Sequence, residues 1–521
     1  MHNNVGLILQ KRASLTPDIP GLVDVATGTR LTFKALDQRA NQAANLYLSL
    51  GVKKGDRVGL LLLNGLEFVE SVFGLAKIGA IIAPLNWRLV ADELDFIIND
   101  CGVSTLVFDS DFVEVVRNLQ QRQTTVQQWL QVRANNNLAD FAQAYNENLN
   151  NSSDVVPPIN GAEEDVVYIM YTSGTTGLPK GVVHTHDTAC WASITSLATL
   201  DLRLGDRYLS MLPLFHIGGL NPMVNNIMAG AAVFIVRTFD PARIWRIVND
   251  EKITCMGAVP AMLNFMLQHY AENKIDHSHL RYCLVGAAPV PVSLIETYQT
   301  MKINLLQVYG LTESCAPGCV LAEHDALTHI GSTGKAFFHT DVKVVRSDGS
   351  IAAVGETGEI LLRGPHIMRG YWNNPEATAN TLQDGWLHTG DVGVMDTEGY
   401  ITIKDRIKDM IISGGENIYP AEVESVLQSH PKILEAAVVG RPHEKWGESP
   451  LAFVVKKESD IDTDAIFAYC KSKLAPYKCP RDILFIDTLP RNPSGKILKR
   501  VLRDQYLSTA ARENAVGVNP D

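Results

Sequence analysis

The most constraining stretch of the sequence is a loop rich in glycine and hydroxyl residues that lies between two apolar runs. The run at 166–170 is hydrophobic and partly β-branched, which predicts a buried strand. Its glycines let successive amides turn toward an anion, while its hydroxyls and its lysine add further donors. The loop therefore predicts a polyphosphate site. Its residues are Thr172, Ser173, Gly174, Thr175, Thr176, Gly177 and Lys180.

This loop differs from a Walker P-loop. A Walker loop places its lysine and a following serine or threonine at the start of a helix. Here Pro179 precedes the lysine, and the apolar run 181–183 that follows predicts a second strand. The difference disfavours a kinase or GTPase of the P-loop class.

The length of the chain exceeds what a single hydrophobic core usually holds, so its 521 residues predict two or more domains. The net charge of −11 argues against nucleic acid as a partner. No apolar run approaches the length of a membrane span, and the eight cysteines are scattered. We therefore expect a cytoplasmic protein with reduced, buried thiols, and the sequence leaves open whether it is a monomer or a homodimer.

Strand and helix patterns alternate through most of the chain. Such alternation predicts βαβ units and a largely parallel sheet. The stretch 120–154 is rich in Gln and Asn, and we expect a helix and a solvated connector there. Short strands and turns beyond 355 predict a β-rich subdomain. The predicted fold is α/β: a large N-terminal domain (1–404) of two βαβ-type subdomains plus a β-rich subdomain, and a small mobile α+β C-terminal domain (409–521) beyond a boundary at 405–408.

Two neighbouring strand patterns end in loops suited to a nucleotide. Ligands of open α/β sheets bind at such carboxyl ends. The first loop consists of small residues that let backbone atoms approach a flat ring such as adenine, although such a stretch on its own is more often a tight turn. In the second, Tyr309 can stack on adenine, Thr312 can bond the α-phosphate, and Glu313 can hold Mg²⁺. The two loops consist of Gly286, Ala287, Ala288 and Pro289, and of Tyr309, Gly310, Leu311, Thr312 and Glu313.

Three further motifs place single polar residues in a suggestive context. Asp391 ends the stretch 386–391 and suits the two ribose hydroxyls, whereas a lone Gly-Asp is usually a turn. Lys496 lies between two turn formers and a strand-like run, where it can stabilise charge that develops on an acid and the α-phosphate; its structural alternative is a solvated loop tip. His216 lies in the apolar stretch 212–220. It is suited to bind an acyl carboxylate, and its structural alternative is a buried histidine of the core.

These motifs, in this order over nearly the whole chain, resemble those of the adenylate-forming superfamily, and within it the AMP-forming acyl-CoA synthetases. Two stretches, 405–420 and 442–448, are almost identical to those of bacterial fatty-acyl-CoA synthetases. The resemblance implies a reaction in two steps. A fatty carboxylate attacks the α-phosphate of MgATP to give acyl-adenylate and pyrophosphate, and the thiol of the cosubstrate CoA then displaces AMP.

The resemblance also implies roles for residues of the C-terminal part. Asp391 and Arg406 bind ribose, and Lys408 is the hinge. Gly414 and Gly415 line the path of the pantetheine arm, with Trp446 near CoA. After the first step the small domain rotates and withdraws its lysine, because a charge placed for adenylation obstructs the thiol. At position 287, where this chain has alanine, many relatives have glycine.

Several alternatives remain open at this point. The same chemistry on an aromatic acid, as in a coumarate- or benzoate-type ligase, is the nearest one. An adenylation domain that serves a carrier protein and an inactive nucleotide-binding regulatory protein are more remote, and the presence of both Lys496 and Glu313 speaks against the second. A separate hypothesis is weak peripheral contact with lipid headgroups through a basic face. That face would consist of Lys11, Arg12, Arg203, Arg207, Arg243 and Arg246.

Overall fold

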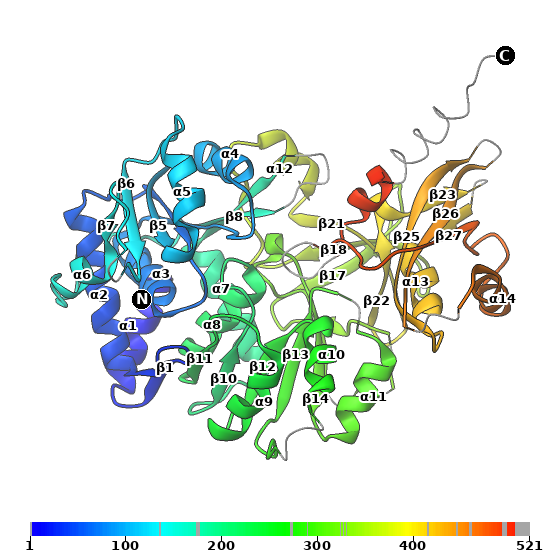
Figure 1. Ribbon diagram of the computed structural model, residues 1–521, viewed down its shortest axis with the longest axis horizontal. Coiled ribbons are helices and arrows are strands. Elements are labelled where there is room, and N and C mark those ends of the chain that lie inside the picture. Colours follow the sequence, from blue (N-terminus) through cyan, green and yellow to red (C-terminus); the bar gives the residue numbers. More distant parts are fainter. Residues whose placement is uncertain are drawn as a thin grey trace. The chain divides into compact units, whose positions relative to one another are not determined.

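The computed structural model divides into two compact units (Figure 1). Unit 1 comprises Met1–Val342 and Leu361–Thr389, and unit 2 comprises Lys343–Ile360 and Gly390–Asp521. The residues that the structure describes are 3–134, 137–172, 178–270, 275–288, 290–322, 325–326, 328–329, 331–413, 416–443, 446–457, 461–491 and 497–505.

Two large sheets form the framework of unit 1. The first has nine strands, of which the six from β14 to β1 in the order below run parallel. Across this sheet the order is β16 (Lys335–Ala336), β15 (Cys319–Leu321), β14 (Asn304–Tyr309), β13 (Tyr282–Gly286), β12 (Cys255–Ala258), β10 (Arg207–Ser210), β11 (Ala232–Ile235), β1 (Pro20–Asp24) and β2 (Thr29–Thr32).

The second sheet has eight strands, six of which are parallel, while β9 and β19 run antiparallel to their neighbours at one edge. Across this sheet the order is β19 (Gly370–Tyr371), β9 (Lys180–Thr185), β8 (Val166–Thr172), β4 (Ile81–Pro84), β3 (Arg57–Leu61), β5 (Val103–Asp109), β6 (Gln128–Val132) and β7 (Gln143–Ala144).

Helices and short 3₁₀ turns connect these strands. In unit 1 they are α1 (Val5–Leu15), α2 (Phe33–Ser49), α3 (Leu66–Ile78), α4 (Ala91–Cys101), η1 (Ser110–Phe112), α5 (Val113–Gln120), α6 (Tyr145–Asn150), α7 (His186–Thr199), α8 (Ile217–Ala229), α9 (Pro241–Asp250), α10 (Pro260–Gln268), α11 (Val292–Thr300), η2 (Thr312–Ser314) and α12 (Pro375–Thr381). Asp240 is the N-cap residue of α9, where it accepts hydrogen bonds from two amides of the first turn and is followed by proline.

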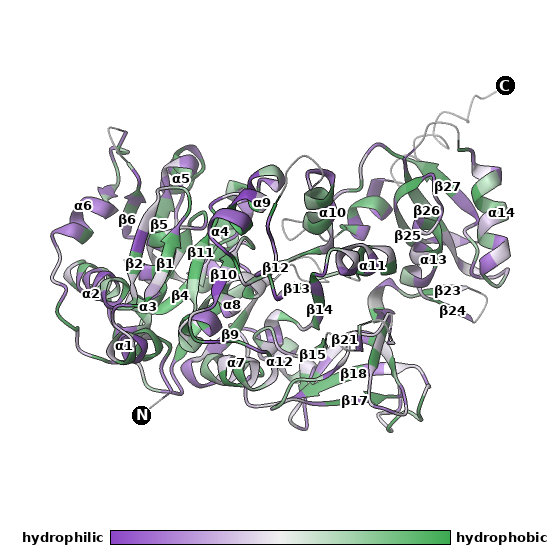
Figure 2. Ribbon diagram, turned by 90° about the horizontal axis from the view of Figure 1, so that it is seen from below, coloured by the Kyte–Doolittle hydropathy of each residue, from purple (hydrophilic) through white to green (hydrophobic). Residues whose placement is uncertain are grey.

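Three hydrophobic clusters separate the layers of unit 1. The first lies between the two sheets and includes residues of α1, α2, α3, α7 and α8. The second lies under α9, α10 and α11, and the third under α4 and α5. Neighbours such as Val233 and Phe234 enter different clusters, because successive side chains of a strand point to opposite faces. Figure 2 shows the result, with strands such as β5 and β11 hydrophobic and the peripheral helix α6 hydrophilic.

The remaining strands form two small sheets. One contains β17 (Asp341–Val345), β18 (Gly358–Arg363), β21 (Trp386–Met395) and β20 (Leu382–Gln383), with β22 (Ile401–Arg406) paired to β21. The other, in unit 2, contains β24 (Glu416–Ile418), β23 (Ile411–Ser413), β26 (Gly447–Lys456) and β25 (Ile433–His443), with β27 (Asp482–Phe485) paired to β26. Unit 2 also contains η4 (Ile407–Asp409), α13 (Pro420–Gln428) and α14 (Thr463–Lys473).

The predicted α/β class, with a β-rich part and a small α+β part, is confirmed. One local prediction is only partly confirmed: 120–154 contains a helix, α6, but also the strands β6 and β7, which the sequence patterns did not indicate. The division into units passes through the sheet of β17, β18 and β21 rather than near 405. The domain limits 1–404 and 409–521 stay a prediction.

Two further expectations concern the environment of the protein. All eight cysteines are buried, and none forms a disulfide. Within the described residues, no helix combines the length and the apolar character needed to cross a membrane.

A backbone strain lies at the end of β13. Ala287 adopts a φ of +68°, in the left-handed region, whereas the adjacent Ala288 has no positive φ. The left-handed region costs a residue with a Cβ roughly 1–2 kcal/mol, because the Cβ approaches the carbonyl oxygen. This cost explains why glycine suits the position and why the alanine of this chain is unusual there.

We therefore expect Ala287→Gly to raise the free energy of unfolding of unit 1 by up to about 1 kcal/mol, since relief of strain exceeds the added entropy of the unfolded chain. The matched control, Ala288→Gly, relieves no strain and should lower the free energy of unfolding by roughly 0.5–1 kcal/mol. Urea denaturation of both variants measures the difference. Equal shifts in the same direction would show that the left-handed conformation is not strained.

Candidate active site

The base of the predicted phosphate loop is a hairpin between β8 and β9. These strands pair antiparallel, and Thr172 lies directly opposite Lys180. The predicted second strand is thus present and begins at the lysine. The loop residues between them that were assigned to phosphate binding, Ser173, Gly174, Thr175, Thr176 and Gly177, lie outside the described residues, as does Pro289 of the adenine loop.

The two predicted adenine loops lie at the same edge of the first sheet. β13 and β14 are parallel neighbours with Gly286 opposite Val308, so their carboxyl ends meet there. Gly310 accepts no side chain, because a Cβ would lie 1.6 Å from the carbonyl oxygen of Ala316. Tyr309 is buried beside it. The arrangement brings the backbone of both strand ends into reach of one flat ligand.

A buried histidine joins the second sheet to the loop that follows β14. His184 on β9 lies with its Nε2 2.7 Å from the carbonyl oxygen of Thr312. Burial lowers the pKa of His184 to about 4, so the ring is neutral at pH 7. A carbonyl oxygen only accepts, so the neutral ring carries its hydrogen on Nε2 and donates it there. His184 thereby fixes the backbone of Thr312.

Glu313 is held by a tyrosine that the sequence motifs do not single out. The hydroxyl of Tyr371 donates to Glu313 Oε1 at 2.8 Å, and the amide of Met368 donates to the Glu313 carbonyl at 2.8 Å. Burial and the adjacent Glu313 carboxylate raise the pKa of Tyr371 well above its usual value, so the hydroxyl keeps its proton. The ammonium of Lys180 lies 5.2 Å from the centre of the same ring. Lys180, Tyr371 and Glu313 therefore form one cluster.

His216 is the N-cap residue of α8. Its Nε2 is buried and has no hydrogen-bond partner among the described residues. Burial, assisted by the nearby Arg88, lowers the pKa of His216 to about 4, so the ring is neutral. The guanidinium of Arg88 lies over the ring of Trp87, 4.6 Å from its centre. A buried nitrogen without a partner costs free energy, which a ligand bonded to it recovers.

The two glycines after His216 have different roles. A Cβ on Gly218 would meet nothing within 4 Å, so this residue borders open space. A Cβ on Gly219 would lie 2.3 Å from the carbonyl oxygen of Pro213. Only Gly218 thus leaves room for a ligand, whereas Gly219 allows α8 to pack against the preceding loop.

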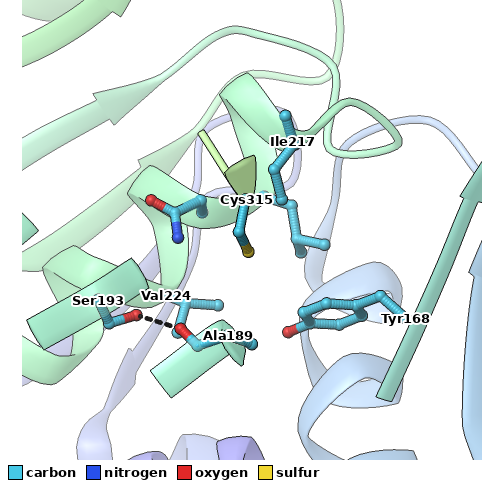
Figure 3. A pocket seen from close by; sticks show the side chains of 8 residues that line it. Tyr168, Ala189, Ser193, Ile217, Val224 and Cys315 are labelled. Carbon is cyan, nitrogen blue, oxygen red and sulfur yellow. Dashed lines mark hydrogen bonds between the residues drawn. The ribbon is translucent and has the colours of Figure 1, made fainter. Parts of the chain in front are cut away.

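A small cavity lies between α7, α8 and β8 (Figure 3). Its volume is about 10 Å³, roughly the room that one water molecule needs. The buried hydroxyl of Tyr168, which lines it, has no hydrogen-bond partner within the described part of the chain. The lining residues are Tyr168, Ala189, Ser193, Ile217, Leu220, Asn221, Val224 and Cys315.

The segment after β14 connects this cavity to the nucleotide loops. Cys315 lines the cavity and lies two residues after Glu313. Cys315 and Ala316 adopt φ values of +54° and +93°, which non-glycine residues rarely do. Such strain is common at functional sites, where the surrounding structure enforces it. One short, strained segment therefore borders both places.

In unit 2, Asp391 and Arg406 lie opposite each other on β21 and β22. Arg406 Nε lies 3.0 Å from Asp391 Oδ1, and the aspartate is buried. Asp405, which precedes Arg406, accepts a hydrogen bond from the amide of Ala421 at 2.7 Å and so helps to cap α13. Lys408 lies in η4, and its side chain is outside the described part. The two residues assigned to ribose are thus brought together.

The loop that carries Lys496 lies outside the described residues, but its ends are fixed to unit 2. Arg491 and Ile497 form a bridge, and the amide of Leu498 donates to the Pro490 carbonyl at 2.8 Å. Lys499 pairs with Glu424 at 2.8 Å. Gly414 and Gly415 are also outside the described residues, between two paired strands. Trp446 is partly exposed.

Metal ligands and surface charges complete the description. Among the described residues, no group of three or more His, Cys, Asp or Glu side chains could hold a metal ion. Two of the basic residues considered for lipid contact are paired with acids: Arg203 pairs with Asp201, and Arg207 pairs with Glu251 at 3.0 Å. Arg12 donates to the carbonyl of Met228. These pairs reduce the positive charge that this surface offers.

Comparison with known proteins gives a consistent result. Residues 9–372 match the AMP-binding enzyme family, and residues 422–496 match the AMP-binding enzyme C-terminal domain. A long-chain-fatty-acid–CoA ligase of Mycobacterium tuberculosis, FadD13, is 41% identical over 98% of this chain and 100% of its own length.

Solved structures agree. A fatty acyl CoA synthetase of Mycobacterium tuberculosis is 40% identical, with a TM-score of 0.80 over 97% of this chain and 99% of that one. The o-succinylbenzoate CoA synthetase MenE of Bacillus subtilis, solved with its acyl-adenylate intermediate, is 33% identical. Its TM-score is 0.86 over 97% of this chain and 98% of that one. The chain therefore belongs to the AMP-binding enzyme family, as an AMP-forming acyl-CoA ligase.

Proposed function

We propose that this ligase converts a fatty acid to its CoA thioester with MgATP. In the first step, a carboxylate oxygen of the fatty acid attacks the α-phosphorus, and the bond to pyrophosphate breaks. In the second step, the sulfur of deprotonated CoA attacks the acyl carbon, and the bond to AMP breaks. The products are pyrophosphate, AMP and fatty-acyl-CoA.

The observation that carries the proposal is the small cavity lined by residues of α8, the helix that begins after His216. Ile217, Leu220 and Val224 follow the histidine at helical spacing and line one wall. An acid whose carboxylate is bound by His216 Nε2 would direct its tail along this wall. Because the cavity is small, its walls must move apart to admit a tail. The likeness to a long-chain-fatty-acid–CoA ligase supports the same substrate class.

The nucleotide would bind at the strand ends of unit 1. Thr172 to Lys180 would hold the β- and γ-phosphates, Thr312 the α-phosphate, and the loops 286–289 and 309–311 the adenine. Glu313 fits a magnesium ion, because Mg²⁺ on ATP takes one or two carboxylates besides phosphates and waters, and only one Glu313 oxygen is bonded to Tyr371. When bound, the metal neutralises charge on the phosphates.

Unit 2 would supply the remaining groups. Asp391 and Arg406 would bind ribose, and Lys496 would stabilise charge in the first step. Rotation about Lys408 would then withdraw Lys496 and present Gly414, Gly415 and Trp446 to CoA. The fixed ends of the Lys496 loop support this proposal, because they tie the lysine to the rest of unit 2.

A second candidate is activation of an aromatic acid. The observation that favours it is the buried Tyr168 hydroxyl, which lacks a partner within the described residues and lines the cavity beside Asn221. An acid with a polar far end could bond both groups, whereas an aliphatic tail could not.

Lys496→Ala should lower the rate of adenylation by at least roughly 10²–10³-fold, the usual effect of removing one preorganised donor. Acyl-adenylate supplied directly should still react with CoA. Acid-dependent exchange of pyrophosphate into ATP measures the first step, and thioester formation measures the second. Lys471→Ala, an exposed lysine on α14, is the control. Loss of both half-reactions would contradict the division of labour.

A panel of acids tests the substrate class. Four more methylenes in dodecanoate than in octanoate contribute up to about 3 kcal/mol at about 0.8 kcal/mol each. We therefore expect kcat/KM for thioester formation to favour dodecanoate by up to about 100-fold. If benzoate derivatives turn over faster than every fatty acid tested, activation of an aromatic acid replaces activation of a fatty acid as the proposed function.

Val224→Phe tests the path of the tail. Val224 lies seven residues, or about 10 Å, along α8 from Ile217, so only a long tail reaches it. The larger side chain should lower kcat/KM for dodecanoate by at least about tenfold and leave that for hexanoate within about twofold, with an overpacking cost of about 1–3 kcal/mol in stability. Equal losses for both acids would place the tail elsewhere.

A further inference from the structure

Tyr371 is fixed by the edge strand β19. This strand pairs with β9, with Tyr371 opposite Val182. The amide of Trp372 donates to the Gly181 carbonyl at 2.7 Å, and the amide of Tyr371 donates to Thr378 Oγ1 at 2.9 Å. The backbone at Tyr371 is therefore tied directly to the strand that begins with Lys180.

The side chain of Tyr371 contacts two charged residues from separate segments. Its hydroxyl donates to Glu313 Oε1 at 2.8 Å, and Lys180 Nζ lies 5.2 Å from the centre of its ring. A long glutamate or lysine side chain loses rotamer freedom when a ligand fixes it. A neighbour that orders both side chains beforehand removes part of that cost from binding.

We propose that Tyr371 is a positioning residue of the nucleotide site. Its hydroxyl holds one oxygen of Glu313 so that the other can face a magnesium ion. Its ring holds the ammonium of Lys180 at the end of the phosphate loop. This inference rests on the proposed function, because it requires that Glu313 serves the metal and Lys180 the phosphates.

The hydroxyl and the ring can be separated by substitution. Tyr371→Phe removes the bond to Glu313 but keeps the ring beneath Lys180. Tyr371→Leu removes both. Because Glu313 acts on the nucleotide through the metal, the first variant should weaken binding only when Mg²⁺ is present. Because Lys180 acts on the phosphates directly, the second should weaken binding in both conditions.

The experiment is calorimetric binding of a non-hydrolysable ATP analogue to the full chain, with Mg²⁺ or with EDTA. Tyr371→Phe should raise the Kd about five- to tenfold with Mg²⁺ and less than about twofold with EDTA. Tyr371→Leu should also raise the Kd about threefold with EDTA. The control, Tyr270→Phe, removes a hydroxyl from a tyrosine that packs against Trp245 under α9 and should change neither value.

A double-mutant cycle decides whether the effect acts through Glu313. Tyr371→Phe should add less than about twofold to the loss caused by Glu313→Gln. Multiplicative losses, or equal losses with Mg²⁺ and EDTA, would overturn the inference, as would an unchanged Kd in Tyr371→Phe. If wild type binds the analogue and only this pattern fails, the proposed function stands. If the wild-type protein does not bind the analogue with Mg²⁺, the inference about Tyr371 and the proposed function both fail.

Discussion

The nucleotide site of unit 1 depends on a connection between two sheets. Tyr309 ends a strand of the nine-stranded sheet, whereas Lys180 begins a strand of the eight-stranded sheet. His184 crosses between them and donates to the carbonyl of Thr312 at 2.7 Å. Burial keeps that histidine neutral, so the bond persists without a charge in the core. This bond, together with the bond of Tyr371 to Glu313, fixes Thr312 and Glu313 relative to the strand that begins at Lys180.

The strain around η2 follows from the same constraint. The chain leaves β14, passes under His184 and Tyr371, and then turns back into β15 within a few residues. Cys315 and Ala316 take left-handed conformations to complete this turn. The turn also brings Cys315 to the cavity between α7 and α8. In the proposed function, this single tight turn would hold a phosphate on one side and border the acid site on the other.

Much of this could be predicted from the sequence, because hydrophobic periodicity and loop chemistry are local. The strands around 171–181, 286 and 309 and the start of α9 follow from such patterns. β6 was missed because it contains a buried glutamine: Gln131 donates to Ser110 Oγ at 3.0 Å and accepts the amide of Ala139 at 2.8 Å. These hydrogen-bond partners stabilise a polar residue in a buried strand, and the local sequence pattern does not indicate them.

Tyr371 was missed for a related reason. Its importance comes from the pairing of β19 with β9, which joins residues nearly 190 positions apart. His184 left a weak signal, a polar residue in an apolar strand, but its partner lies far along the chain. The charged residues of the candidate site could thus be predicted from composition and spacing. The residues that orient them, such as Tyr371 and His184, could be identified only from their contacts in the folded structure.

In the proposed function, the strand ends of unit 1 hold the adenine and the phosphate of the acyl-adenylate, and α8 holds the acyl tail. A crystal structure with a non-hydrolysable dodecanoyl-adenylate analogue tests this arrangement. We expect adenine between 286–288 and 309–310, the phosphate mimic at Thr312, and the tail along Ile217, Leu220 and Val224. An analogue that contacts none of these residues would contradict the proposed function.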